Sequence, residues 1–148
     1  MIKRFNVRVY GILIRENRVL VSDEFIKGNN ITKFPGGGLE FGEGAIDCLI
    51  REFKEELDLE ITVSKHFYTT DFFVSSSFDT NSQVISIYYL VETSQKFSFT
   101  TSEKPFDFIK KAGAQSLRWI GMNKISDNDF TLIIDKRVGE MLSKDSHK

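Results

Sequence analysis

The chain has 148 residues, the usual size of one domain, so we expect a single domain over residues 1–148. Its net charge of −1 argues against a protein that holds nucleic acid through clustered Lys and Arg. The single cysteine, Cys48, allows no internal disulfide, which fits a reducing cytoplasm. Charges interrupt the first apolar residues, so no signal peptide is predicted, and no stretch approaches the ~20 apolar residues of a membrane span. We therefore expect a cytoplasmic protein that binds neither nucleic acid nor membrane.

The first quarter of the sequence predicts two strands and an irregular segment. Residues 5–14 and 18–22 are rich in β-branched and aromatic side chains, and the Glu16-Asn17 pair between them predicts a hairpin. Residues 27–30 have the composition of a loop, and residues 31–34 are short and extended because Phe34 precedes Pro35. In the Pro-Gly-Gly-Gly run of residues 35–38 we expect neither a helix nor a regular strand.

The rest of the sequence alternates between helices and strands. Residues 44–57 predict a helix, residues 60–74 and 83–92 two long strands, and residues 75–82 a polar connection. Residues 93–114 show no clear pattern. A last strand is predicted over residues 116–120, an amphipathic helix over 131–142 and a frayed tail over 143–148. Strands on both sides of a central helix indicate an α/β sandwich with a mixed sheet.

The predicted helix over residues 44–57 has two faces of different character. Its apolar residues recur at spacings of three and four, and on a helical wheel they fall within about 60° of Ile46. These residues are Ile46, Leu49, Ile50, Phe53 and Leu57. Three glutamates fall near 240°, 180° and 280° on the same wheel, and we expect them on the face opposite the core. They are Glu52, Glu55 and Glu56.

The three glutamates repel one another, and a neighbouring cation would offset that cost. Hard divalent ions prefer oxygen ligands, and Mg²⁺ in particular binds through a few carboxylates, waters and substrate phosphates. Glutamates on a helix usually form only a solvated face. Here, however, they follow a glycine-rich turn and are accompanied by Glu43 and Arg51, which a solvated face does not require.

Residues 37–59 resemble the signature of the Nudix family, G-x5-E-x7-R-E-U-x-E-E-x-G-U, in which U is apolar. Eight of its nine specified positions match, from Gly37 through Glu43 to Leu59, and a pattern of this length with several fixed charges is specific. The departure is Asp58, which replaces a glycine. That position lies just past the helix, where a left-handed residue closes it, and aspartate tolerates this conformation better than most residues.

The resemblance implies a Nudix-type α/β/α sandwich with a divalent-ion site. The ligands of Mg²⁺, or alternatively Mn²⁺, would be the carbonyl of Gly36 and the carboxylates of Glu52, Glu55 and Glu56. Arg51 would pair with Glu43 and hold the loop against the helix, although an ordinary surface ion pair is the alternative. As general base the resemblance leaves Glu55, Glu56 or an acid from elsewhere, for which Glu103 is the best candidate.

The implied reaction is attack of a metal-activated water on a phosphorus of a diphosphate linkage in a small nucleotide substrate. Marks of the ADP-ribose, NADH, coenzyme A and diadenosine polyphosphate subgroups are missing from the sequence. Nucleoside triphosphates, nucleotide sugars or a similar nucleotide derivative therefore remain as substrates. The alternatives to an enzyme are a nucleotide-sensing domain without turnover and a scaffold protein. The resemblance also allows a homodimer. Cys48 is expected to be structural, because a thiolate nucleophile would need a nearby base.

Overall fold

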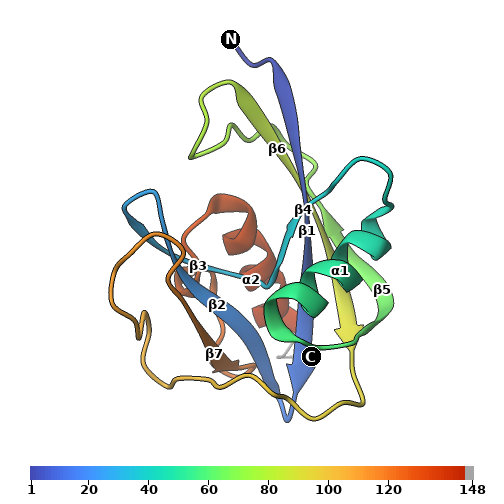
Figure 1. Cartoon of the computed structure of the whole chain (residues 1–148), viewed down its shortest axis with the longest axis vertical. Coiled ribbons are helices and arrows are strands. Elements are labelled where there is room, and N and C mark those ends of the chain that lie inside the picture. Colours follow the sequence, from blue (N-terminus) through green and yellow to red (C-terminus); the bar gives the residue numbers. More distant parts are fainter. Residues whose placement is uncertain (146–148) are drawn as a thin grey trace. The chain divides into compact units, whose positions relative to one another are not determined.

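Seven strands and two α-helices make up the computed structural model, which describes residues 1–145 (Figure 1). In chain order they are β1 (Arg4–Arg15), β2 (Arg18–Ile26), β3 (Asn29–Lys33), β4 (Gly36–Gly38), α1 (Ala45–Leu57), β5 (Thr62–Thr69), β6 (Ser82–Glu92), β7 (Gln115–Gly121) and α2 (Ile133–Asp145). A short 3₁₀ helix, η1 (Asp127–Asp129), precedes α2. Within residues 1–145, neither α-helix has the length and apolar run that a bilayer crossing needs.

The first compact unit contains Met1–Ile12 and Gly36–Phe99. In its sheet β4 pairs with β1, β6 lies beside β1, and β5 pairs with β6 at the edge. The pairs β1–β4 and β5–β6 are antiparallel, whereas β1 and β6 run in the same direction (Figure 1). The pairing of β5 with β6 is shifted at two points, between Val63 and Lys65 and between His66 and Tyr68.

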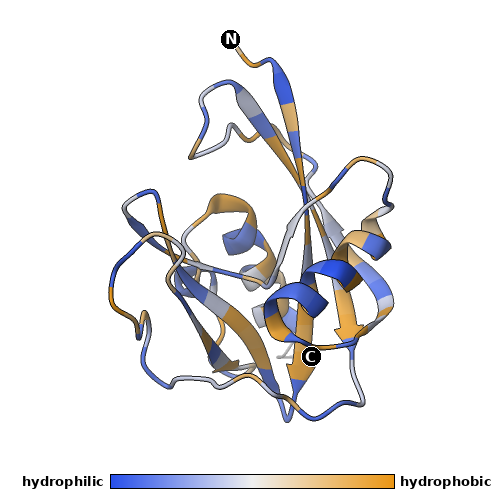
Figure 2. Ribbon diagram, viewed as in Figure 1, coloured by the Kyte–Doolittle hydropathy of each residue, from blue (hydrophilic) through white to orange (hydrophobic). Residues whose placement is uncertain are grey.

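Helix α1 packs on this sheet through Phe53, which is fully buried. The Phe53 ring lies so close to Gly11 of β1 that a side-chain carbon at position 11 would overlap it. Leu49 and Leu57 are buried on the same side of the helix. Hydrophobic residues dominate the middle of β1, while the exposed face of α1 is hydrophilic (Figure 2). The position of α1 is therefore fixed by apolar contacts with β1.

The second compact unit contains Leu13–Pro35 and, in its described part, residues 100–145. Strand β2 pairs with β7 from Arg18 to Glu24, and β3 and the end of β1 also pair with β2, all in antiparallel fashion. Helix α2 buries Ile134, Val138 and Leu142. The rings of Phe34 and Phe130 stack with their centroids 4.5 Å apart.

A buried ion pair lies inside the second unit. Asp23 is completely buried, and Arg118 donates to both of its carboxylate oxygens at 2.9 and 3.0 Å. The Thr32 hydroxyl and the Phe106 backbone N–H donate to the same carboxylate, at 2.7 and 3.2 Å. These contacts compensate the desolvation of Asp23 and connect the irregular segment around Phe106 to β2.

Most of the predicted elements are confirmed, and the α/β class with a mixed sheet is confirmed with them. Several boundaries are wrong. Strand β2 continues to Ile26, β3 already begins at Asn29, β5 ends at Thr69 instead of residue 74, and α2 begins at Ile133. Ser143–Asp145 belong to α2 rather than to a frayed tail, and the tail residues 146–148 lie outside the described residues. The single-domain assignment stays a prediction.

The glycine run was expected to lack regular structure, but Gly36–Gly38 form the strand β4. Their partners in β1 are Tyr10, Val9 and Arg8. Glycine has a low preference for strands because it contributes no packing, and here the hydrogen bonds to β1 outweigh that preference.

The expected core face of α1 is wrong in part. Ile46 and Ile50 are 47% and 39% exposed, whereas Cys48 is completely buried. Glu52 does not lie opposite the core, because its side chain is only 13% exposed. The face of the helix that carries Cys48 and Glu52 lies against β4. The glycines of β4 have no side chains, which leaves room for the Cys48 thiol and the Glu52 carboxylate.

Candidate active site

The loop between β4 and α1 is fixed by local hydrogen bonds. The backbone N–H of Glu40 donates to the Glu43 carboxylate at 2.9 Å, and the N–H of Glu43 donates to the Glu40 carbonyl at 3.4 Å. Gly44 is the N-cap residue of α1, and its N–H donates to the Asp47 carboxylate at 3.3 Å. An acid in the first turn is also favourable at the positive end of the helix dipole.

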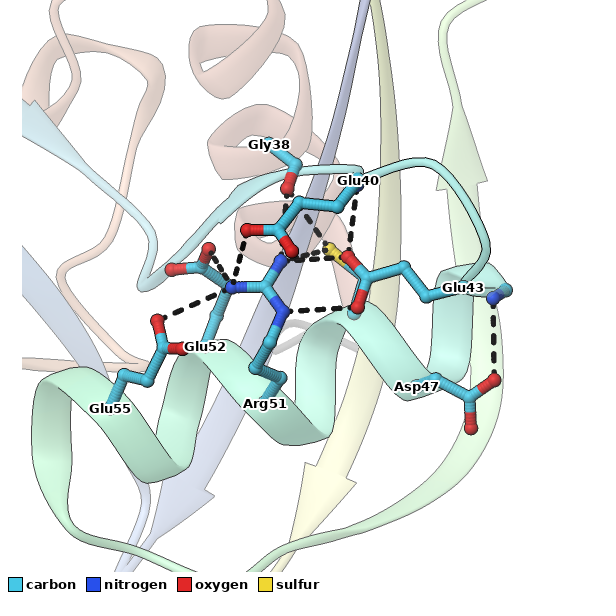
Figure 3. A network of polar contacts seen from close by, with 9 residues as sticks. Gly38, Glu40, Glu43, Asp47, Arg51, Glu52 and Glu55 are labelled. Atoms are coloured by element: carbon cyan, nitrogen blue, oxygen red, sulfur yellow. Dashed lines mark hydrogen bonds and ion pairs between the residues drawn. The ribbon is translucent and has the colours of Figure 1, made fainter.

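Arg51 lies at the centre of the predicted signature (Figure 3). Its Nε and Nη2 donate to the two carboxylate oxygens of Glu43 at 3.0 and 2.7 Å. Its Nη1 donates to Glu52 at 2.9 Å and to Glu55 at 3.3 Å, and lies 3.5 Å from Glu40. Nη2 also donates to the Gly38 carbonyl at 3.2 Å. We call this group, Arg51 with its partners Gly38, Glu40, Glu43, Glu52 and Glu55, the Arg51 network.

Charge within the Arg51 network changes the acidity of its members. Hydrogen bonds from Arg51 lower the pKa of Glu43 to about 2, and the same bonds raise the pKa of Arg51 above its ordinary value. Both groups are therefore ionised at neutral pH. The pair that the resemblance implies is present, and the bidentate geometry distinguishes it from an ordinary surface ion pair.

Two glycines of β4 are required by close contacts. A side-chain carbon on Gly37 would overlap the Glu52 carboxylate, so that carboxylate lies directly against the strand. Gly36 has a φ of 151°, and a side-chain carbon there would overlap the Val9 carbonyl and Tyr10. The glycine at position 36 is therefore required by the pairing with β1, whatever else its carbonyl does.

The three predicted metal-ligand carboxylates differ in exposure. Glu52 is mostly buried against β4, the Glu55 side chain is 59% exposed, and Glu56 is exposed. Among residues 1–145, no three acidic, histidine or cysteine side chains converge closely enough to hold a metal ion as they stand. The donor set nevertheless fits a hard divalent ion, because all three side chains offer carboxylate oxygens. The Glu52 carboxylate lies directly against Gly37, where any other residue would overlap it.

Asp58 ends α1 in the left-handed conformation that the sequence predicts, with φ 49° and ψ 44°. Its N–H donates to the Lys54 carbonyl at 3.1 Å, and the N–H of Leu59 donates to the Phe53 carbonyl at 3.3 Å. The Lys54 ammonium lies 3.0 Å from the Asp58 carboxylate. Aspartate therefore replaces the glycine of the signature without disturbing the helix end.

Cys48 and Glu103 were considered from the sequence as a nucleophile and as a general base. Cys48 is buried beside the Arg51 network, and burial raises the pKa of its thiol to about 11, so it is not a nucleophile at neutral pH. Its Sγ lies 3.5 Å from the Gly38 carbonyl. Glu103 is exposed, in the second unit, and its role as a base stays a prediction.

Three contacts of Arg51 were not predicted from the sequence: those with Glu40 and Gly38 in the loop, and that of Nη2 with the Cys48 Sγ at 3.8 Å. Cys48 lies three residues before Arg51, a spacing that places two side chains on one face of a helix, so its proximity could have been inferred. The Glu40 and Gly38 contacts depend on the path of the loop, for which the sequence holds no spacing rule.

The model of the NUDIX domain family matches residues 4–137. Among solved structures, the chain is similar to the MutT protein from Methanosarcina mazei Go1, with a TM-score of 0.70, 17% identity, and coverage of 100% of this chain and 99% of that one. It is also similar to the MutT NUDIX hydrolase from Burkholderia pseudomallei, with a TM-score of 0.65, 16% identity, and coverage of 93% and 96%.

An ADP-ribose pyrophosphatase from Streptococcus suis 89-1591 has a TM-score of 0.58 and 13% identity, with coverage of 96% of this chain and 90% of that one. No curated protein matches the sequence. Identities this low show a common fold, whereas the domain match covers most of the chain and includes the whole signature. The chain therefore belongs to the Nudix family of pyrophosphohydrolases, as its residues 37–59 predict.

Proposed function

We propose that this protein hydrolyses a diphosphate linkage in a nucleoside diphosphate joined to another group, with Mg²⁺ or Mn²⁺ as cofactor. The observation that supports it most directly is the Arg51 network, in which a part-buried bidentate pair with Glu43 joins the loop to the helix that carries Glu52, Glu55 and Glu56. The substrate class that we favour is a nucleoside triphosphate, a nucleotide sugar or a similar derivative.

The carboxylates of Glu52, Glu55 and Glu56, with the carbonyl of Gly36, would hold the divalent ion. When bound, such an ion supplies charge neutralisation for phosphate oxygens and lowers the pKa of a water ligand. The protein contributes the placement of the ligands. Gly37 lets the Glu52 carboxylate lie against β4, and the Arg51–Glu43 pair fixes the loop next to it.

For the general base we retain the alternatives Glu55, Glu56 and Glu103. All three side chains are exposed, so each is accessible to a water molecule. A base in hydrolysis must take a proton from the attacking water and therefore has to remain in its carboxylate form.

The test is a screen of nucleoside triphosphates, nucleotide sugars and dinucleotides with Mg²⁺ and with Mn²⁺, followed by phosphorus NMR of the products. Reaction in ¹⁸O-labelled water identifies which phosphorus receives the oxygen. We expect Glu56→Gln to reduce turnover strongly and Glu140→Gln, on the exposed face of α2, to leave it unchanged. Absence of turnover with every substrate, or equal rates for wild type and Glu56→Gln, would contradict the enzymatic function.

A further inference from the structure

The two ends of the Arg51 guanidinium face different sets of partners. Nε and Nη2 contact the loop, through Glu43 at 3.0 and 2.7 Å and through the Gly38 carbonyl at 3.2 Å. Nη1 contacts the helix, through Glu52 at 2.9 Å and Glu55 at 3.3 Å. One end thus holds a structural pair, while the other holds two of the carboxylates that the proposed function assigns to a divalent ion (Figure 3).

A guanidinium and a divalent ion compete for the same carboxylate oxygens. Both require the oxygen lone pairs, and two cations brought side by side repel each other. The Glu52 side chain is mostly buried against Gly37, which limits how far it can turn from Arg51. Nη1 bonds one oxygen of each carboxylate, Oε1 of Glu52 and Oε2 of Glu55, so a divalent ion that binds these oxygens has to displace Nη1.

We propose, on the basis of the function proposed above, that Arg51 is an internal counter-ion whose Nη1 releases Glu52 and Glu55 when the divalent ion binds. We call this exchange of Nη1 for the metal the hand-over. Nε and Nη2 stay on Glu43 throughout, so the loop keeps its place. Without the metal, Nη1 neutralises carboxylates that would otherwise repel one another. When the metal binds, the hydrogen bonds from Nη1 to Glu52 and Glu55 break. The free energy needed to break them lowers the affinity for the metal.

Glu40 provides Nη1 with a partner after the hand-over. Its carboxylate already lies 3.5 Å from Nη1, on the loop rather than on the helix, and its side chain is 68% exposed. Glu40 is not part of the Nudix signature and has no place in the proposed ligand set. The Nη1 end therefore keeps a carboxylate partner in both states.

The hand-over is tested by measuring Mn²⁺ affinity, with calorimetry and electron paramagnetic resonance, for wild type, Arg51→Gln, Glu43→Gln and Lys54→Gln. Arg51→Gln and Glu43→Gln both break the ion pair that holds the loop, but only Arg51→Gln removes the competing cation. Arg51→Gln should therefore bind Mn²⁺ about tenfold more tightly than Glu43→Gln. Lys54→Gln removes the same charge from the same helix, but Lys54 pairs with Asp58, so its Mn²⁺ affinity should equal that of wild type. If a folded Arg51→Gln protein bound Mn²⁺ no more tightly than a folded Glu43→Gln protein, the hand-over would be overturned.

A second measurement on the wild-type protein does not depend on the fold of a variant. On addition of Mg²⁺, the carboxyl ¹³C resonances of Glu52 and Glu55 should shift while that of Glu43 stays in place. A shift of Glu43 with Glu55 unchanged would overturn the hand-over. If neither wild type nor Arg51→Gln binds Mn²⁺, the metal-dependent function fails as well. If wild type binds Mn²⁺ and turns over nucleotides but Arg51→Gln binds Mn²⁺ no more tightly than Glu43→Gln, the hand-over alone fails.

Discussion

Arg51 and Glu43 form a bidentate ion pair, with Nε–Oε2 at 3.0 Å and Nη2–Oε1 at 2.7 Å. The pair joins two segments that are eight residues apart, the loop before α1 and the middle of the helix. We expect Glu43→Gln to lower kcat/KM by roughly 10–100-fold, the usual effect of losing a residue that orients metal ligands. Steady-state kinetics and circular dichroism of both proteins check this. An unchanged kcat/KM in a folded variant would show that the pair has no positioning role.

Gly37→Ala should impair the site more than it impairs the fold. The added methyl group would overlap the Glu52 carboxylate, and overpacking of this kind costs about 1–3 kcal/mol of unfolding free energy. We expect Mn²⁺ binding and turnover to be lost while the protein stays folded. Gly38→Ala is the control from the same strand, because its methyl group would meet only the flexible end of Arg8, at 3.4 Å. Equal Mn²⁺ affinities for the two variants would contradict the contact.

Asp58→Gly should raise the free energy of unfolding, by up to about 1 kcal/mol, because glycine adopts the left-handed conformation without a steric penalty. The exposed ion pair with Lys54 that is lost contributes little. Asp58→Ala, which loses the pair and keeps the penalty, should be less stable than wild type. Urea unfolding of the three proteins decides between these outcomes, and a glycine variant no more stable than the alanine variant would refute the strain.

Asp79 predicts a pH-dependent contribution to stability. Hydrogen bonds from the Ser82 hydroxyl and from Arg4 hold the pKa of its carboxyl well below the ordinary range. A lowered folded-state pKa stabilises the protein above the ordinary aspartate pKa of about 3.9, and this stabilisation is lost as the pH falls toward the folded value. Wild type should therefore exceed Asp79→Asn in urea unfolding at neutral pH, by a margin that shrinks in acid. A margin independent of pH would contradict the shift.

The Cys48 thiol should be unreactive in the native protein. Its pKa is raised to about 11 by burial, so little thiolate forms near the ordinary thiol pKa of about 8.5. We expect a thiol reagent such as Ellman's reagent to modify Cys48 only after unfolding in guanidinium chloride. Rapid reaction of the native protein would show that the thiol is accessible.

The positions of helices and strands along the chain were predicted better than the side chains that each of them buries. Helix α1 and its left-handed end at Asp58 follow from spacing and from local backbone preferences, which act within a few residues. The exposure of Ile46 and Ile50 could not be predicted, because periodicity gives the direction of an apolar stripe but not the side from which the sheet approaches it. Gly37 and Gly38 of β4 carry no side chains, so the strand lies close to Glu52 and Cys48.

The partners within the site were predicted unevenly for a related reason. The Arg51–Glu43 pair has a fixed spacing in the signature, so the resemblance implied it. The contact of Nη1 with Glu52 and Glu55 was not predicted, because a single arginine can bond to any of several neighbouring acids and only the folded loop decides among them.

Strand β5 ends the sheet of the first unit, and its two register shifts have a consequence for the behaviour of the protein at high concentration. A straight edge strand presents a regular row of donors and acceptors that a strand of another molecule can extend. The irregular pairing at Val63–Lys65 and His66–Tyr68 twists this row, and the exposed Lys65 adds charge to it. β5 is therefore a poor template for strand addition, which protects the protein from growth into β-aggregates through this edge.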